Sequence, residues 1–210
     1  MFLPRLTRRA LIGSGLAATA TLSAGASLAQ EAQAPRLTGD MVKGDPDAPV
    51  TVVEYASFTC PHCKTFHEQV FPRINEEFIE TGKVRFILRE VYFDRYGLWA
   101  GMLARCGGED RYFGMVDMIF ANQSSWPRGN DPAEVASNLF AMGRQAALTD
   151  AQMDACLQDG EWAQTLVEQY QTNASADDVT GTPSFVIDGE KYSNMGYSEF
   201  ERVLNEKLGS

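Results

Sequence analysis

The chain has 210 residues, of which 18 are Lys or Arg and 28 are Asp or Glu, giving a formal net charge of −10. A charge of that sign repels phosphates and anionic lipid headgroups, so we expect neither a nucleic acid nor a membrane surface as partner. The length suits one domain, or one domain with a large insertion.

The first 29 residues have the layout of a secretory signal peptide. A basic start that includes the Arg8-Arg9 pair precedes a mildly apolar run rich in Ala, Gly, Ser and Thr. Small residues at Ser27 and Ala29 suit a cleavage site before Gln30. The arginine pair resembles a twin-arginine signal, and an uncleaved anchor is the alternative, although the apolar run is barely long enough to span a membrane. We therefore expect export, with the mature protein in the periplasm.

The next part of the chain predicts a lead-in, a strand and a helix. Residues 30–49 are rich in Pro, Asp and Ala and are expected to be flexible. Residues 50–58 are mostly β-branched and aromatic, which predicts a buried strand. A helix should begin at Pro61, where the missing N–H costs nothing, and carries an apolar stripe at four-residue spacing. Pro72 should kink this helix and Gly82 should end it.

A second strand is expected over residues 83–91, where apolar residues alternate with arginines. Strand signals then vanish, and we expect helices over residues 98–106, 110–122, 132–142, 150–157 and 161–174. Strands return on either side of the Asp188-Gly189 step, which predicts a tight hairpin. Ser198, with Glu201 three residues later, predicts a capping box that opens a last helix.

The predicted elements follow the order strand, helix, strand, helical block, strand, strand, helix. A β-α-β unit and a β-β-α unit separated by an insertion is the element order of the thioredoxin fold. We therefore expect an α/β protein: a thioredoxin fold with an inserted all-helical domain. The thioredoxin-like part should comprise residues 50–94 and 177–210, and the helical insertion residues 95–176.

Two of the four cysteines form a Cys60-Pro61-His62-Cys63 motif between the first strand and its helix. Unpaired N–H groups and the positive dipole end at a helix start stabilise a thiolate, which here is that of Cys60. Cys63 should lie one turn inside, near enough to form a disulfide and less exposed. His62 can carry positive charge beside the thiolate. A lowered Cys60 pKa stabilises the reduced form and makes the disulfide more oxidising.

At this point the stretches VVEYASFTCPHC and GTPSFVIDG together resemble the two signatures of DsbA-type thiol–disulfide oxidoreductases. The resemblance covers about residues 50–91 and 180–208, with a helical insertion between them in the family as well. It implies that Pro183 is a cis-proline facing the disulfide. Thr182 is a departure from the valine of strong oxidases, and its hydroxyl could bond a sulfur.

The resemblance also gives Glu54 a role. An acid in so apolar a strand is costly unless it has a task or a partner. The family places a buried carboxylate six residues before the first cysteine, as Glu54 stands before Cys60, and its implied role is to exchange protons with Cys63. The alternative is that Glu54 turns outward at a sheet edge.

Cys106 and Cys156 remain, and an even number of cysteines in an exported chain suggests disulfides. They resemble the pair of a family branch that carries a second disulfide in its helical part. We therefore expect a structural disulfide between them, with two buried free thiols as the alternative.

The resemblance implies a periplasmic, monomeric dithiol oxidase that introduces disulfides into unfolded exported proteins. It needs no cofactor besides the Cys60–Cys63 disulfide, and a quinone-linked membrane protein of the DsbB type would reoxidise it. An isomerase or reductase of the same fold is the first alternative. A redox-inert surface protein is a remote one, as is a zinc module using the motif cysteines, His62 and His67. We otherwise expect His67 to be an ordinary, partly buried helix residue.

Overall fold

The computed structural model describes residues 34–209, so the predicted signal peptide lies outside the described residues. The description below concerns residues 34–209 alone. Its sheet has five strands in the order β1-β3-β2-β4-β5. The strands are β1 (Met41–Lys43), β2 (Val50–Ala56), β3 (Val84–Glu90), β4 (Ser184–Ile187) and β5 (Glu190–Ser193). Only β2 and β3 pair in parallel; the other neighbours are antiparallel.

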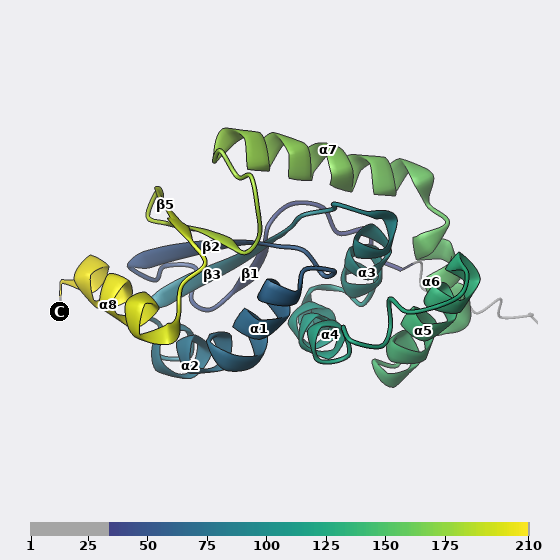
Figure 1. The fold of residues 1–210 in the computed structure, drawn as a ribbon, viewed down its shortest axis with the longest axis horizontal. Coiled ribbons are helices and arrows are strands. Elements are labelled where there is room, and N and C mark those ends of the chain that lie inside the picture. Colours follow the sequence, from purple (N-terminus) through teal and green to yellow (C-terminus); the bar gives the residue numbers. More distant parts are fainter. Residues whose placement is uncertain (1–33, 210) are drawn as a thin grey trace, which may run out of the picture. The chain divides into compact units, whose positions relative to one another are not determined.

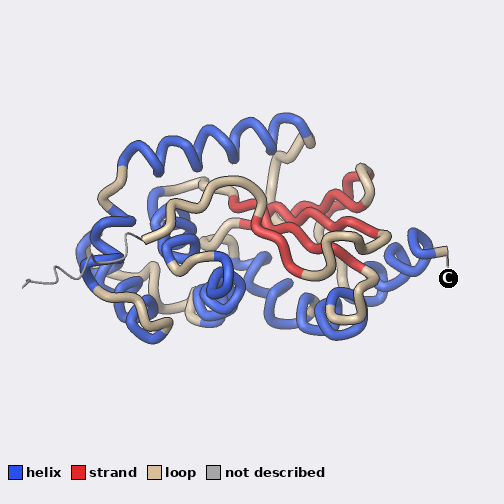
Figure 2. Tube along the Cα trace, turned by 180° about the vertical axis from the view of Figure 1, so that it is seen from behind, coloured by secondary structure: helices blue, strands red, loops and turns tan. Residues whose placement is uncertain are grey.

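Helices cover both faces of this sheet and continue beyond one end of it (Figures 1 and 2). They are α1 (Pro61–Gln69), α2 (Phe71–Ile74), the π-helix η1 (Asn75–Ile79), α3 (Arg95–Cys106), α4 (Glu109–Ala121), α5 (Pro132–Gln145), α6 (Asp150–Leu157), α7 (Gly160–Ala176) and α8 (Tyr197–Leu208). The five helices predicted between residues 98 and 174 are all present, each within a few residues of its expected bounds. Among the described residues, no helix is both long and apolar enough to cross a membrane.

The sequence predicts a kink at Pro72, and the structure instead interrupts the helix two residues earlier, at Val70. α1 ends at Gln69, and Val70 separates it from α2, in which Pro72 occupies the first turn. Proline is tolerated there because the first N–H groups of a helix have no partner within it. The following turns widen into η1 before the chain turns at Gly82 towards β3.

The prediction of a flexible lead-in over residues 30–49 is wrong in part, because this segment contains the strand β1. Met41 pairs with Leu88 of β3, and its side chain is only 4% exposed. Asp40 beside it accepts a hydrogen bond of 2.7 Å from Arg89. Three residues are too few to show an alternating pattern, so only the pairing partner reveals this strand.

Helix α7 corrects the expected boundary between the helical insertion and the sheet. Figure 1 shows it running from the helical block over the face of the sheet opposite α1. Its Ala174 belongs to a buried cluster with Val53, Ile87 and Val186 of the sheet. The hydroxyl of Tyr55 on β2 also donates to the carbonyl of Asn173, at 3.0 Å. The segment 95–176 is therefore continuous in sequence, but its last helix is also a layer of the thioredoxin-like part.

The hairpin prediction is confirmed and the capping box is wrong. Asp188 and Gly189 have φ values of 47° and 82°, the left-handed pair required by a two-residue turn between β4 and β5. Helix α8 begins earlier than predicted, at Tyr197, and its N-cap residue is Gly196, which has no side chain to form a capping hydrogen bond. The hydroxyl of Tyr197 donates to Glu77 at 2.6 Å, so a tertiary contact holds the first residue of this helix against η1.

Candidate active site

Cys60 is the N-cap residue of α1 and is half-buried. A hydrogen bond from the Cys63 thiol is the largest cause that lowers the Cys60 pKa, to about 5. The backbone N–H groups of Cys63 and His62 act in the same direction, while burial opposes them. These are the unpaired donors of a helix start, so the local turn from β2 into α1 itself stabilises a thiolate.

Cys63 lies one turn inside α1 and is completely buried. Burial raises its pKa far above the ordinary range of a thiol, and the neighbouring Cys60 and the charge of Glu54 raise it further. The two sulfurs are therefore unequal: the Cys60 sulfur is accessible and ionised near neutral pH, and the Cys63 sulfur is enclosed and protonated.

The second predicted signature packs against the first. The Thr182-Pro183 peptide bond is cis, and the Cys60 sulfur lies 3.3 Å from the carbonyl oxygen of Thr182, within hydrogen-bonding distance for a thiol. The Thr182 hydroxyl is buried and has no hydrogen-bond partner among the described residues. The loop before β4 thus brings Thr182 and Pro183 to Cys60 across more than 120 residues of sequence.

Glu54 is fully buried in the middle of β2. Its Oε2 lies 2.9 Å from Nε2 of His67, whereas its Oε1 has no hydrogen-bond partner among the described residues. The alternative that Glu54 turns outward at a sheet edge is therefore wrong, because β2 is a central strand covered on this face by α1.

His67 is not the ordinary helix histidine that the sequence suggested, because it holds the buried carboxylate of Glu54. Its side chain is 2% exposed, and it follows Cys63 by one helical turn on the inner face of α1. Two sequence signals together could have indicated the pair. One is an acid in an apolar strand that needs a partner, and the other is a histidine four residues after a buried cysteine.

Pro61 and His62 occupy the exposed rim of the site. Pro61 is the first residue of α1, as predicted. The His62 imidazole is not among the leading groups that lower the Cys60 pKa; that residue contributes through its backbone N–H.

Gln123, just after α4, is a site residue that the sequence analysis missed. Its Nε2 donates hydrogen bonds of 2.9 Å to the carbonyl oxygens of both Phe58 and Cys60. It is 8% exposed, and it ties the helical insertion to the loop that carries Cys60. No local pattern marks this glutamine, because its partners lie more than 60 residues earlier.

The remaining cysteines are joined in the structure: Cys106 on α3 and Cys156 on α6 form a disulfide with both residues buried. Neither is then available as a metal ligand. In the part of the chain that the structure describes, no three His, Cys, Asp or Glu side chains gather as a metal site would require.

Residues 36–206 match the family described as Thioredoxin. A Rickettsia bellii protein named for protein-disulfide oxidoreductase activity is 31% identical over 80% of this chain, but the match spans only 64% of that relative's length. Disulfide bond formation protein D of Bacillus subtilis is 26% identical, with 83% of this chain and 79% of that protein covered.

Solved structures give the same result. Wolbachia pipientis alpha-DsbA1 is 31% identical, covers 82% of this chain and 92% of its own, and has a TM-score of 0.72. BdbD of Bacillus subtilis in its oxidised form, at 22% identity and a TM-score of 0.71, shares the fold over 81% of this chain and 94% of its own. The family match, these relatives and the paired signatures around Cys60 and Pro183 place the chain in the thioredoxin family, as a DsbA-type member.

Proposed function

We propose that this protein is a thiol–disulfide oxidoreductase that acts as a dithiol oxidase, donating its Cys60–Cys63 disulfide to exported proteins. The observation that supports this best is the inequality of the two sulfurs. A hydrogen bond from the Cys63 thiol, with the N–H groups of the helix start, lowers the Cys60 pKa to about 5, and the fold encloses Cys63. Names of relatives that refer to protein-disulfide oxidoreductase activity and to disulfide bond formation agree with this chemistry.

The reaction proceeds through two exchanges at Cys60. A client thiolate attacks the Cys60 sulfur, the bond to Cys63 breaks, and Cys63 takes up a proton. A second client thiolate then attacks the client sulfur of this mixed disulfide, and Cys60 leaves as a thiolate. The client loses two electrons and the protein gains them. A stable thiolate is a good leaving group, so the second step favours release of an oxidised client.

The Cys60 pKa also favours the oxidising direction. A thiol with a pKa of about 5 is stabilised as thiolate at pH 7 by at most about 2.7 kcal/mol, equivalent to roughly 60 mV for a two-electron couple. Solvent screening at the half-exposed Cys60 reduces this value. Stabilising the reduced form makes the disulfide a stronger oxidant.

Glu54 is the proposed proton partner of Cys63. The carboxyl group is buried near enough for its charge to raise the Cys63 pKa, and its Oε1 is uncommitted among the described residues. A protonated Glu54 supplies the proton when Cys63 leaves the disulfide. The carboxylate removes it when the dithiol is reoxidised.

The setting of the reaction follows from residues 1–29, whose signal-like layout supports export to the periplasm. There the clients would be unfolded proteins with free thiols. The electrons would pass to a quinone-linked membrane protein of the DsbB type, and the protein would act as a monomer without a further cofactor.

Thr182 favours a second candidate, an isomerase or reductase, because threonine before the cis-proline is common in isomerases of the resembled family. Its hydroxyl lies buried in the loop that contacts Cys60. Refolding of a reduced secreted ribonuclease separates the candidates. The oxidised protein should restore ribonuclease activity stoichiometrically, and Cys60→Ala should not. Failure with the reduced ribonuclease, together with rescue of a scrambled one by the reduced protein, would instead establish the isomerase.

A further inference from the structure

Cys63 must take up and release a proton in each cycle, although it and Glu54 are enclosed by the fold. Cys63 and Glu54 are both 0% exposed, so neither can exchange a proton directly with bulk water. Glu54 has Leu88 of β3 and Phe185 of β4 as its neighbours in the sheet, and both are apolar. Its one hydrogen-bond partner among the described residues is His67.

The two ring nitrogens of His67 have different surroundings. Its Nε2 is 2.9 Å from Glu54, and its ring stacks on Phe120 at a centroid distance of 4.3 Å. Phe71 contacts the ring from another side, at 5.0 Å. These aromatic contacts hold the ring in place, while Nδ1 is buried and has no hydrogen-bond partner in the part of the chain that the structure describes.

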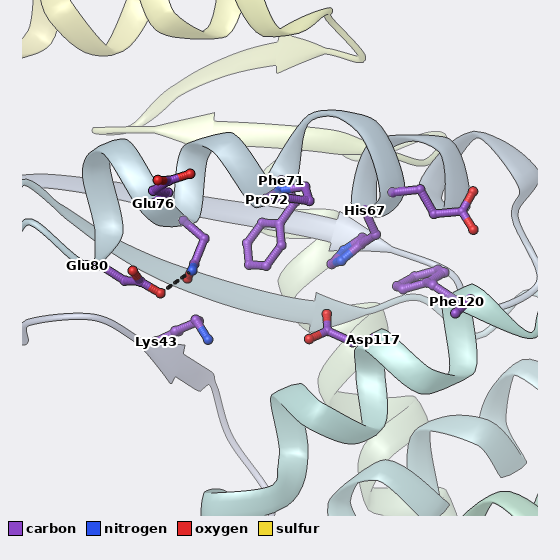
Figure 3. A pocket seen from close by; sticks show the side chains of 11 residues that line it. Lys43, His67, Phe71, Pro72, Glu76, Glu80, Asp117 and Phe120 are labelled. Carbon is purple, nitrogen blue, oxygen red and sulfur yellow. Dashed lines mark hydrogen bonds between the residues drawn. The ribbon is translucent and has the colours of Figure 1, made fainter.

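A cleft of about 590 Å³ lies beside this ring, behind the active-site helix. Figure 3 shows His67 between Phe71 and Phe120, with Asp117 below it on α4. Burial raises the Asp117 pKa. None of the residues around the Cys60 sulfur lines the cleft, so it reaches His67 from the side away from the client-facing thiolate.

We propose that His67 is a positioning residue that links Glu54 to the water of this cleft, so that the proton exchanged by Cys63 enters and leaves behind the active-site helix. The inference rests on the proposed function, because exchange at Cys60 creates the demand for a proton at Cys63. The His67 ring lies between the Glu54 carboxylate and the cleft, and its Nδ1 has no hydrogen-bond partner among the described residues.

The proton balance closes over one cycle. When Cys63 leaves the disulfide, Glu54 gives it a proton and becomes a carboxylate. His67 then passes its Nε2 proton to Glu54 and takes one from cleft water at Nδ1, remaining neutral as the other tautomer. Reoxidation reverses each transfer: Nδ1 releases a proton to the cleft, Nε2 of His67 accepts the proton of Glu54, and the resulting carboxylate takes the proton of Cys63.

The test is chemical rescue of the disulfide exchange rate. Stopped-flow fluorescence would follow reduction of the Cys60–Cys63 disulfide by dithiothreitol in the wild type, His67→Ala, and the matched control Glu76→Gln, which lines the same cleft. His67→Ala should react about 100-fold more slowly, at the lower end of the range expected for a lost proton-transfer group. Added imidazole should restore most of the rate. Pyrazole has the same shape and is a much weaker base, so it should not.

Two further variants guard against a merely structural effect. His67→Gln keeps a donor towards Glu54 but cannot carry a proton through its side chain, so it should fold normally and still react slowly. In a Glu54→Gln background, replacing His67 should cause no further loss of rate, and imidazole should have no effect.

Wild-type rates in both His67 variants, or equal rescue by pyrazole and imidazole, would overturn the proposal. Dithiothreitol needs no natural client. A protein that shows imidazole-specific rescue but fails to oxidise the ribonuclease would therefore contradict the proposed function alone.

Discussion

Gln123 binds the carbonyl oxygen of Cys60 through its Nε2 at 2.9 Å, so the helical insertion holds the residue that carries the reactive sulfur. The same nitrogen holds Phe58, two residues earlier. The insertion therefore does more than enlarge the thioredoxin-like part: it supports the loop in which the helix start must be formed.

Gln123→Met should lower stability by about 1–2 kcal/mol, because it keeps the side-chain volume but leaves buried carbonyl groups without their donor. Urea unfolding of the reduced protein would measure the change, with Ser124→Ala as the exposed neighbouring control. The same variant should raise the Cys60 pKa if the loop loosens. Unchanged stability would show that water replaces the amide without cost.

Cys63→Ala should trap client proteins as stable mixed disulfides, because the Cys60 thiolate can still attack a client disulfide but Cys63 is no longer present to break the bond that forms. Cys60→Ala should trap none, because Cys63 is fully buried. Non-reducing gels of extracts from cells that produce each variant, after alkylation of free thiols, would reveal the adducts. The reverse pattern would assign the attacked sulfur to Cys63.

The reduced form should be more stable than the oxidised form at neutral pH, and the difference should depend on pH. The folded-state Cys60 pKa of about 5 lies below the unfolded value of about 8.5. The Cys60 thiolate therefore contributes its full stabilisation of the reduced fold only above the unfolded-state pKa of Cys60. This stabilisation is lost as the pH falls through about 5. The folded state raises the pKa of Cys63, so this residue destabilises the reduced fold once the pH exceeds the pKa of Cys63 in the unfolded chain. The pH range to test is therefore 4.5 to 8.

Thermal melts of both forms across that window would measure this difference. The advantage of the reduced form should grow from pH 5 towards pH 8. An oxidised form that is clearly the more stable throughout, or a Cys60 that titrates near 7 in alkylation kinetics, would support the reductase or isomerase instead.

Removing the second disulfide should destabilise the helical block without abolishing exchange at Cys60. The cysteines are separated by 50 residues, and the chain-entropy account gives roughly 4 kcal/mol for a loop of that size. A Cys106→Ala/Cys156→Ala double variant should therefore unfold at lower urea concentration. Mass spectrometry of the wild type after alkylation would check the bond itself, since two alkylated thiols at these positions would refute it.

The sequence alone was sufficient for features that depend on neighbouring residues. The Cys-x-x-Cys motif between an apolar strand and Pro61 predicts a sulfur at a helix start because every group involved lies within a few residues. The Asp188-Gly189 turn and the bounds of the inserted helices follow in the same way from backbone preferences and short-range periodicity.

Tertiary structure decided the features whose partners are distant in the chain. β1 is a strand only because β3 supplies its hydrogen bonds, and the first residue of α8, Tyr197, is held by Glu77, which lies 120 residues earlier. Gln123 reaches Cys60 across 63 positions. A polar side chain that will be buried shows its type in the sequence but not its partner.

Glu54 and His67 form a pair of which the sequence indicated one member and the tertiary structure identified the other. The sequence revealed an acid in an apolar strand, and burying such a group is costly enough to imply that something compensates for it. Only the packing of α1 on β2 identified His67 as the partner. The cost of burying a charge is a local property of the residue, whereas the group that offsets it is chosen by the fold.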